Sequence, residues 1–163
     1  MELRGDGILL RRPEAADVDA IVAACSDEEI VRYIPLMPVP YERADAEWWI
    51  DHADEAWADG SAYPFVIVDA DTGRLLGAIE VRPEKGDLGY WLARSARGRG
   101  VCTRALRLIL EWHMERPLWL STHPENSASQ RVAERAGFRR VGLISHDPPF
   151  RDGTTQAVRY ELD

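Results

Sequence analysis

The feature that most constrains this fold is the six-residue segment "RGRGVC", Arg97–Cys102. It lies between the strand-like "DLGYWLA" and "VCTRALRLILEWHME", whose apolar residues recur at helical spacing. The first turn of a helix has backbone N–H groups without internal partners, and glycines let a ligand approach the backbone closely. The helix dipole and the arginines add positive potential. The segment therefore predicts a cradle for an anion such as a pyrophosphate. The alternative is a glycine-containing turn with solvated arginines.

The remaining patterns predict an α/β fold that forms a single domain, residues 1–163. We expect a mixed, mostly antiparallel sheet of about seven strands with helices on both faces. The expected strands are 7–13, 62–70, 74–83, 87–93, 117–122, 138–145 and 154–162. The expected helices are 13–27, a short piece within 27–35, 41–60, 101–115 and 126–137.

Composition excludes several classes of protein. Hydrophobic residues make up 45% and charged residues 29%, which is typical of a globular domain and argues against disorder. No apolar run is long enough to span a bilayer, and the N-terminus lacks the apolar core of a signal peptide. The two cysteines have no metal-ligand company, so we expect reduced thiols, a cytoplasmic location and no metal.

Net charge bears on the choice of partner. A net charge of -8 and a pI near 5.0 argue against a nucleic-acid partner, because phosphate neutralisation needs clustered Lys and Arg. A cationic partner or substrate fits this balance better. We expect no membrane partner, and either a monomer or a homodimer.

Three motifs together resemble one family. Arg97-x-x-Gly100-x-Cys102 resembles the acetyl-CoA pyrophosphate motif of the GNAT acetyltransferase superfamily, Gln/Arg-x-x-Gly-x-Gly/Ala, with Cys102 as its one departure. The segments "LLRRPEAADVDAI", "DLGYWLARSARGRG" and "HPENSASQRVAERAGF" are similar to the branch of ribosomal-protein N-terminal alanine acetyltransferases. The resemblance implies a GNAT-like sheet, acetyl-CoA as co-substrate, and direct acetyl transfer to a primary amine without a covalent enzyme intermediate.

The same resemblance implies a set of residues that bind coenzyme A. The backbone near Leu92 is expected to pair with the pantetheine amides, and Asn126 to fix the pantetheine arm. Cys102 is either a reactive thiol beside the cofactor or a small buried filler. The complete expected set is Leu92, Ala93, Arg94, Arg97, Gly98, Arg99, Gly100, Val101, Cys102, Thr103, Asn126 and Ser129.

Catalytic roles are expected for three residues. Many superfamily members have a tyrosine acid where this chain has Ala133, whereas the ribosomal-protein branch has a serine, which matches Ser129. Ser129 is the candidate that protonates the departing thiolate. The alternative is that its side chain makes only a local hydrogen bond to the backbone. For Asn126, the alternative is that it serves only as a helix N-cap. Glu80 or His123 is the candidate base. A solvated carboxylate and a structural histidine are the respective alternatives.

The acceptor is less well defined by sequence. We expect an amine to enter between the acidic helix 41–60 and the loop "HDPPFRDG", although a charge run of this kind is also typical of a solvated face. Trp49, Ala53 and Trp57 form a stripe expected in the core, with Trp48 as a candidate cleft residue. A protein N-terminal α-amine is the leading acceptor. An antibiotic or polyamine, a succinyl-CoA donor, and a non-catalytic acyl-CoA-binding sensor are the alternatives.

Overall fold

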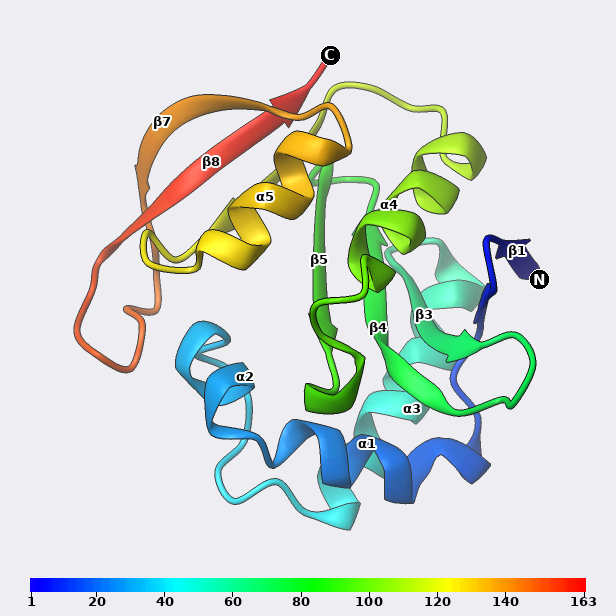
Figure 1. The fold of residues 1–163 in the computed structure, drawn as a ribbon. Coiled ribbons are helices and arrows are strands. Elements are labelled where there is room, and N and C mark those ends of the chain that lie inside the picture. The colour runs from blue at the N-terminus through cyan, green and yellow to red at the C-terminus, as the bar shows by residue number, and fades with distance from the viewer.

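One mixed sheet of eight strands organises the fold of the computed structural model, which describes residues 1–163 (Figure 1). The strand order is β1-β2-β3-β4-β5-β6-β8-β7, and every neighbouring pair is antiparallel except β5 and β6. The strands are β1 Glu2–Gly5, β2 Ile8–Arg11, β3 Tyr63–Asp69, β4 Leu75–Arg82, β5 Asp87–Leu92, β6 Leu118–Thr122, β7 Arg139–Ser145 and β8 Gln156–Leu162. The predicted fold class is confirmed, with one strand more than expected.

The additional strand is β1, which forms a hairpin with β2. The turn between them is Asp6-Gly7, and both residues have positive φ, 49° and 80°. An Asp-Gly pair is the usual solution for a two-residue hairpin turn, because its twist matches that of the strands. The sequence therefore contained the signal for this strand.

Helices cover both faces of the sheet (Figure 1). The α-helices are α1 Val18–Cys25, α2 Glu28–Tyr33, α3 Arg43–Asp59, α4 Val101–Trp112 and α5 Ser127–Arg135; the 3-10 turns are η1 Ala15–Asp17 and η2 Arg94–Ala96. A cluster of ten buried residues joins α1 and α3 to one face, and a cluster of nineteen joins α4 and α5 to the other. None of these helices has the length and apolar composition that a bilayer crossing requires.

Ala53 and Trp57 of the α3 stripe pack in the core, as predicted, whereas Trp49 also lines the cavity described below. Trp57 packs edge-on against Phe65 and donates from Nε1 to the carbonyl oxygen of Pro64 at 2.8 Å. Trp49 packs against the cluster on the α1 face. The expectation for Trp48 is wrong, because its side chain is stacked on His52 and 65% exposed, outside the cavity described below.

The sheet opens between β5 and β6. These two parallel strands are paired only at Asp87 and Trp119, and they separate beyond that point. The β5 edge that faces β6 consequently has no sheet partner over its last residues. This opening determines where the main cavity of the protein lies.

Candidate active site

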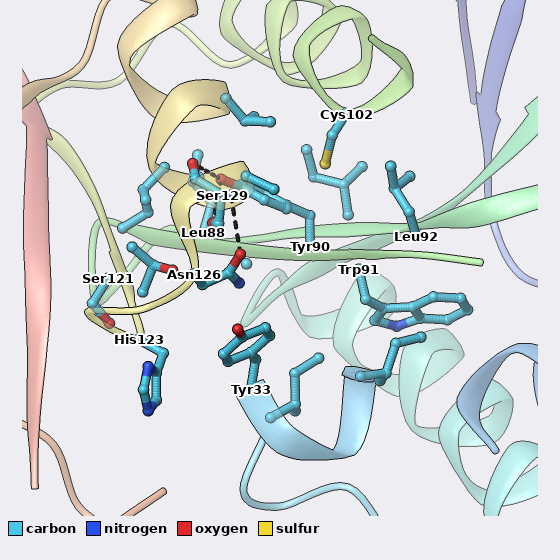
Figure 2. A pocket seen from close by; sticks show the side chains of 18 of the residues that line it. Tyr33, Leu88, Tyr90, Trp91, Leu92, Cys102, Ser121, His123, Asn126 and Ser129 are labelled. Atoms are coloured by element: carbon cyan, nitrogen blue, oxygen red, sulfur yellow. Dashed lines mark hydrogen bonds between the residues drawn. The ribbon is translucent and has the colours of Figure 1, made fainter. Parts of the chain in front are cut away.

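A cavity of about 680 Å³ occupies the opening between β5 and β6. It is lined on one face of the sheet by the start of α4 and by α5, and on the other face by α2 and the 146–150 loop. Figure 2 shows Cys102, Tyr90 and Ser129 on one side of β5, with Tyr33 and Trp91 on the other. A molecule in this cavity can therefore contact both faces of the sheet.

The turn before α4 provides a row of free backbone donors. None of the N–H groups from Gly98 to Thr103 donates to an acceptor in the chain. Gly98 and Gly100 have φ of 76° and 68°, and a Cβ built on either would have no atom within 4 Å. Five of these six residues, all but Arg99, line the cavity at the positive end of a twelve-residue helix, which is the arrangement that binds a phosphate group. The residues present fit the pyrophosphate of coenzyme A.

The arginines of this turn have different roles. The Arg97 guanidinium contacts Asp27 at 3.0 Å and Glu29 at 2.6 Å, so its charge is neutralised and it ties the turn to α2. Arg104 donates to the carbonyl oxygens of Gly100 and Arg99, at 3.3 and 3.1 Å, and holds the turn in shape. Arg99 makes no ion pair or side-chain hydrogen bond. Arg97 is therefore the one arginine of the three whose charge is neutralised, and it is also the only one of the three that lines the cavity.

Cys102 is a small buried residue that lines the cavity. Its side chain packs beneath the turn with 4% of the residue exposed, and burial raises its pKa well above the ordinary value. A thiol reacts as the thiolate, so this environment suppresses its reactivity. The structure favours the structural alternative for this position.

The end of β5 provides fewer free backbone groups than expected. The N–H of Ala93 donates to Leu76 at 2.8 Å, and the carbonyl oxygen of Leu92 accepts from Arg97 at 3.1 Å. Arg94 begins the 3-10 turn η2. The side chain of Leu92 lines the cavity.

Ser129 and Asn126 lie together at the start of α5. The Asn126 side-chain oxygen accepts from the Ser129 N–H at 3.2 Å, so Asn126 is the N-cap of this helix. Its side-chain NH₂ makes no hydrogen bond within the protein and lies at the cavity (Figure 2). The Ser129 Oγ lies 3.0 Å from the hydroxyl of Tyr90, a residue that sequence reasoning missed. Tyr90 lies on β5 and faces the same side as Leu88 and Leu92, which is the pattern of an ordinary core residue.

Glu80 lies on the α1 face of β4 and lines the same cavity. It is directly opposite Gly89 of β5, so no side chain separates it from the opening. Its carboxylate contacts Arg82 at 3.0 Å, and Arg82 makes two further bonds to Asp87 at 2.8 and 3.0 Å. The three charges sum to one negative charge beside the opening.

His123 is held by both of its ring nitrogens. Nδ1 accepts from the N–H of Glu125 at 3.0 Å, and Nε2 lies 2.8 Å from the carboxylate of Asp152. An imidazole that accepts at Nδ1 and donates at Nε2 is neutral and has no free nitrogen for an incoming proton. The ring also packs against Phe150, with 4.6 Å between centroids. This arrangement favours the structural alternative for His123.

The acidic residues of α3 lie away from the cavity. Only Trp49 of this helix lines it. Asp54 pairs with Arg12, and the Asp51 and Glu55 side chains are exposed. The 146–150 loop does line the cavity, as expected. The position of these residues therefore favours the alternative that the acidic run of α3 is a solvent-exposed face.

Comparison with known proteins agrees with this geometry. The acetyltransferase (GNAT) domain family matches residues 8–139. The chain is 23% identical over 147 residues to the uncharacterised N-acetyltransferase p20 of Bacillus licheniformis, covering 84% of this chain and 82% of p20. It is 26% identical over 152 residues to the uncharacterised N-acetyltransferase YnaD of Bacillus subtilis, covering 88% and 86%.

Solved structures share the fold at lower identity. The ribosomal L7/L12 α-N-protein acetyltransferase RimL, in complex with coenzyme A, superposes with a TM-score of 0.87 at 16% identity, covering 99% of this chain and 97% of RimL. The microcin C7 self-immunity acetyltransferase MccE, in complex with acetyl-CoA and AMP, gives 0.85 at 16% identity, covering 97% and 93%.

A mixed sheet opened beside a glycine turn at a helix start defines an acyl-CoA-dependent transferase fold. The chain belongs to the GNAT acetyltransferase family, since that family matches most of its length. It is an N-acetyltransferase, with acetyl-CoA as co-substrate and an amine as acceptor.

Proposed function

We propose that this enzyme acetylates a primary amine carried on a neutral or apolar body, foremost the α-amine of a protein N-terminus. The observation that carries the proposal is the composition of the cavity on the α2 face. Its walls there include Tyr33, Met37, Trp49, Trp91 and Phe150.

Charge pairing in the cavity narrows the acceptor further. Of the lining carboxylates, Glu29 pairs with Arg97, Glu80 and Asp87 share Arg82 and keep one net negative charge, and the fourth, Asp147, is exposed. A polyamine would need several unpaired carboxylates along its length, and the cavity does not provide them. An acceptor with one amine on an uncharged N-terminal residue fits the apolar walls on the α2 face. Neighbours of the same fold that are described as acetylating ribosomal proteins support this choice.

The catalytic groups come from opposite faces of the sheet. Acetyl-CoA supplies the acetyl thioester, for which the 98–103 N–H row, Arg99 and the Asn126 amide are the proposed binding groups. Glu80 receives the proton of the acceptor amine from the α1 face, directly or through water. Ser129 protonates the departing sulfur from the α5 face.

An acceptor panel tests the proposal, with release of the coenzyme A thiol as the readout. We expect the highest kcat/KM for short peptides with a free N-terminal Ala or Ser, and little turnover of spermidine or an aminoglycoside. A peptide with a blocked N-terminus is the control. Preferential turnover of spermidine would contradict the proposal, and absence of turnover with every amine would favour the acyl-CoA sensor.

Replacement of Glu80 tests the proposed base. We expect Glu80→Gln to lower kcat by about 10²-fold near neutral pH, the range for loss of a general base. The loss should shrink as the pH rises past the pKa of the α-amine, about 8, because the amine is then already neutral. Glu84→Gln removes an exposed carboxylate outside this cavity and serves as the control. Equal kcat for Glu80→Gln and Glu84→Gln would exclude Glu80 as the base.

A further inference from the structure

The hydroxyl of Tyr90 reaches Ser129 from beneath α5. Its oxygen lies 3.0 Å from Ser129 Oγ and 3.2 Å from the Ser129 carbonyl oxygen, and it has no other hydrogen-bond partner (Figure 2). The tyrosine ring packs against the nineteen-residue core cluster. A rigid strand therefore places one hydroxyl beside the proposed acid of the reaction.

The Ser129 hydroxyl has one proton and can rotate among staggered positions. If Tyr90 donates to the Ser129 carbonyl oxygen, the serine proton can point back at Tyr90 and away from the cavity. If Tyr90 donates to Ser129 Oγ, the serine proton is free to point at a sulfur atom in the cavity. The second arrangement leaves the Ser129 proton no partner on Tyr90 and so favours its donation to the sulfur, as an acid requires.

We propose that Tyr90 is the positioning residue that holds the Ser129 hydroxyl in its proton-donating orientation. The inference rests on the proposed role of Ser129. As the carbon–sulfur bond breaks, Ser129 gives its proton to the sulfur, which keeps the electron pair of that bond. Serine regains a proton from water after product release, and Tyr90 keeps its own proton throughout.

The surroundings of Tyr90 suit a permanent donor. Burial raises the pKa of Tyr90 above its ordinary value, so the hydroxyl stays protonated over the working range of the enzyme. Hydrogen bonds in series strengthen one another, and a donor to Ser129 Oγ makes the serine a better donor in turn. The helix α5 itself has no tyrosine, and its Ala133 is fully buried. The phenolic hydroxyl at this site therefore comes from the sheet.

A second buried tyrosine provides a matched control. Tyr160 of β8 also lies beneath α5, and its hydroxyl donates to the Glu134 carboxylate at 3.2 Å. Tyr160→Phe and Tyr90→Phe therefore each remove one hydroxyl that bonds the same helix from the sheet, and each keeps the ring. A contribution to α5 packing alone would affect both variants alike.

The experiment measures steady-state kinetics and acetyl-CoA affinity for Tyr90→Phe, Tyr160→Phe, Ser129→Ala and the Tyr90→Phe/Ser129→Ala double variant. We expect Ser129→Ala to lower kcat by about 10²-fold. Tyr90→Phe should lower kcat by about tenfold, which corresponds to one hydrogen bond, with acetyl-CoA affinity within about twofold of wild type. The double variant should match Ser129→Ala, and Tyr160→Phe should match wild type in kcat.

Several results would overturn the proposal. Unchanged kcat in Tyr90→Phe, or equal losses in Tyr90→Phe and Tyr160→Phe, would show that Tyr90 only packs. If the kcat losses of the two single variants multiplied in the double variant, Tyr90 would act independently of Ser129. Unchanged kcat in Ser129→Ala would remove the acid role itself, and that outcome is distinct from a failure confined to Tyr90.

Discussion

The two cysteines show how burial controls reactivity at the scale of single residues. Burial raises the pKa of Cys25 to about 12, and that of Cys102 is raised further. At pH 8 only roughly one part in 10⁴ of a thiol with such a pKa is the reactive thiolate. Burial therefore suppresses the reactivity of both thiols in the folded protein.

We therefore predict that neither thiol reacts with Ellman's reagent at pH 8 in the native protein, and that both react after denaturation. The absorbance of the released thiolate gives the count directly. The native thiols react more slowly than the denatured ones because the raised pKa keeps each thiol protonated in the folded state. Rapid reaction of one native thiol that is lost in a Cys102→Ala variant would contradict the role of Cys102 as a filler.

The sequence was informative about some site residues and uninformative about others. Ser129 and Asn126 could be found because a helix N-cap and its third residue are neighbours in the chain. The partners of His123 and Arg97 could not, because Asp152 is 29 positions from His123 and Asp27 is 70 positions from Arg97. Tyr90 was missed because its alternation with apolar residues is also the pattern of an ordinary core position.

At the scale of elements, the charge run of α3 is the clearest case of a surface without a catalytic task. Its carboxylates are exposed, pair with Arg12 and Arg43, or accept backbone N–H groups at the helix ends, and only Trp49 reaches the cavity. Exposed ion pairs of this kind contribute about 0–1 kcal/mol to stability. We therefore expect the exposed ion pairs of α3 to matter little for binding or folding.

We predict that the combined variant Asp51→Asn, Asp54→Asn, Glu55→Gln retains the kcat/KM of wild type within about twofold at low salt. Its free energy of unfolding should change by less than about 1 kcal/mol, since only the Asp54–Arg12 pair is lost. Kinetics at two ionic strengths and a urea titration provide the measurements. If the variant at low salt showed a tenfold loss of kcat/KM, equal to the loss of the wild-type enzyme at high salt, α3 would have a role in steering the acceptor.

The strands and helices themselves were largely predictable. Strands rich in Val, Ile and Leu, such as β3 and β4, are bounded by turn residues and alternate between two buried faces. The strand β1 escaped prediction because it is short, polar and half-exposed, although the Asp6-Gly7 turn indicated a hairpin. The opening between β5 and β6 is a tertiary feature without a local signal, so its place could come only from family resemblance.

At the scale of the whole molecule, the fold brings one opening in the sheet and one helix start to the same cavity. The sheet supplies Glu80 and Tyr90 from opposite faces, α5 supplies Ser129, and the turn before α4 supplies the free N–H row. In the proposed mechanism, the base and the acid therefore approach the acetyl group from opposite faces of the sheet. We propose that acetyl-CoA is held at the 98–103 turn.

Calorimetric titration of acetyl-CoA into Gly100→Ala and Gly73→Ala tests that claim most directly. Both glycines have positive φ, 68° and 72°, and neither has an atom within 4 Å of a built Cβ, so the backbone strain should be the same in the two variants. Gly73 lies in the β3–β4 turn, outside the cavity. We predict at least ~10-fold weaker binding for Gly100→Ala, because its methyl group occupies the space of the phosphate, and wild-type affinity for Gly73→Ala. Equal affinity of the two folded variants for acetyl-CoA would contradict the account.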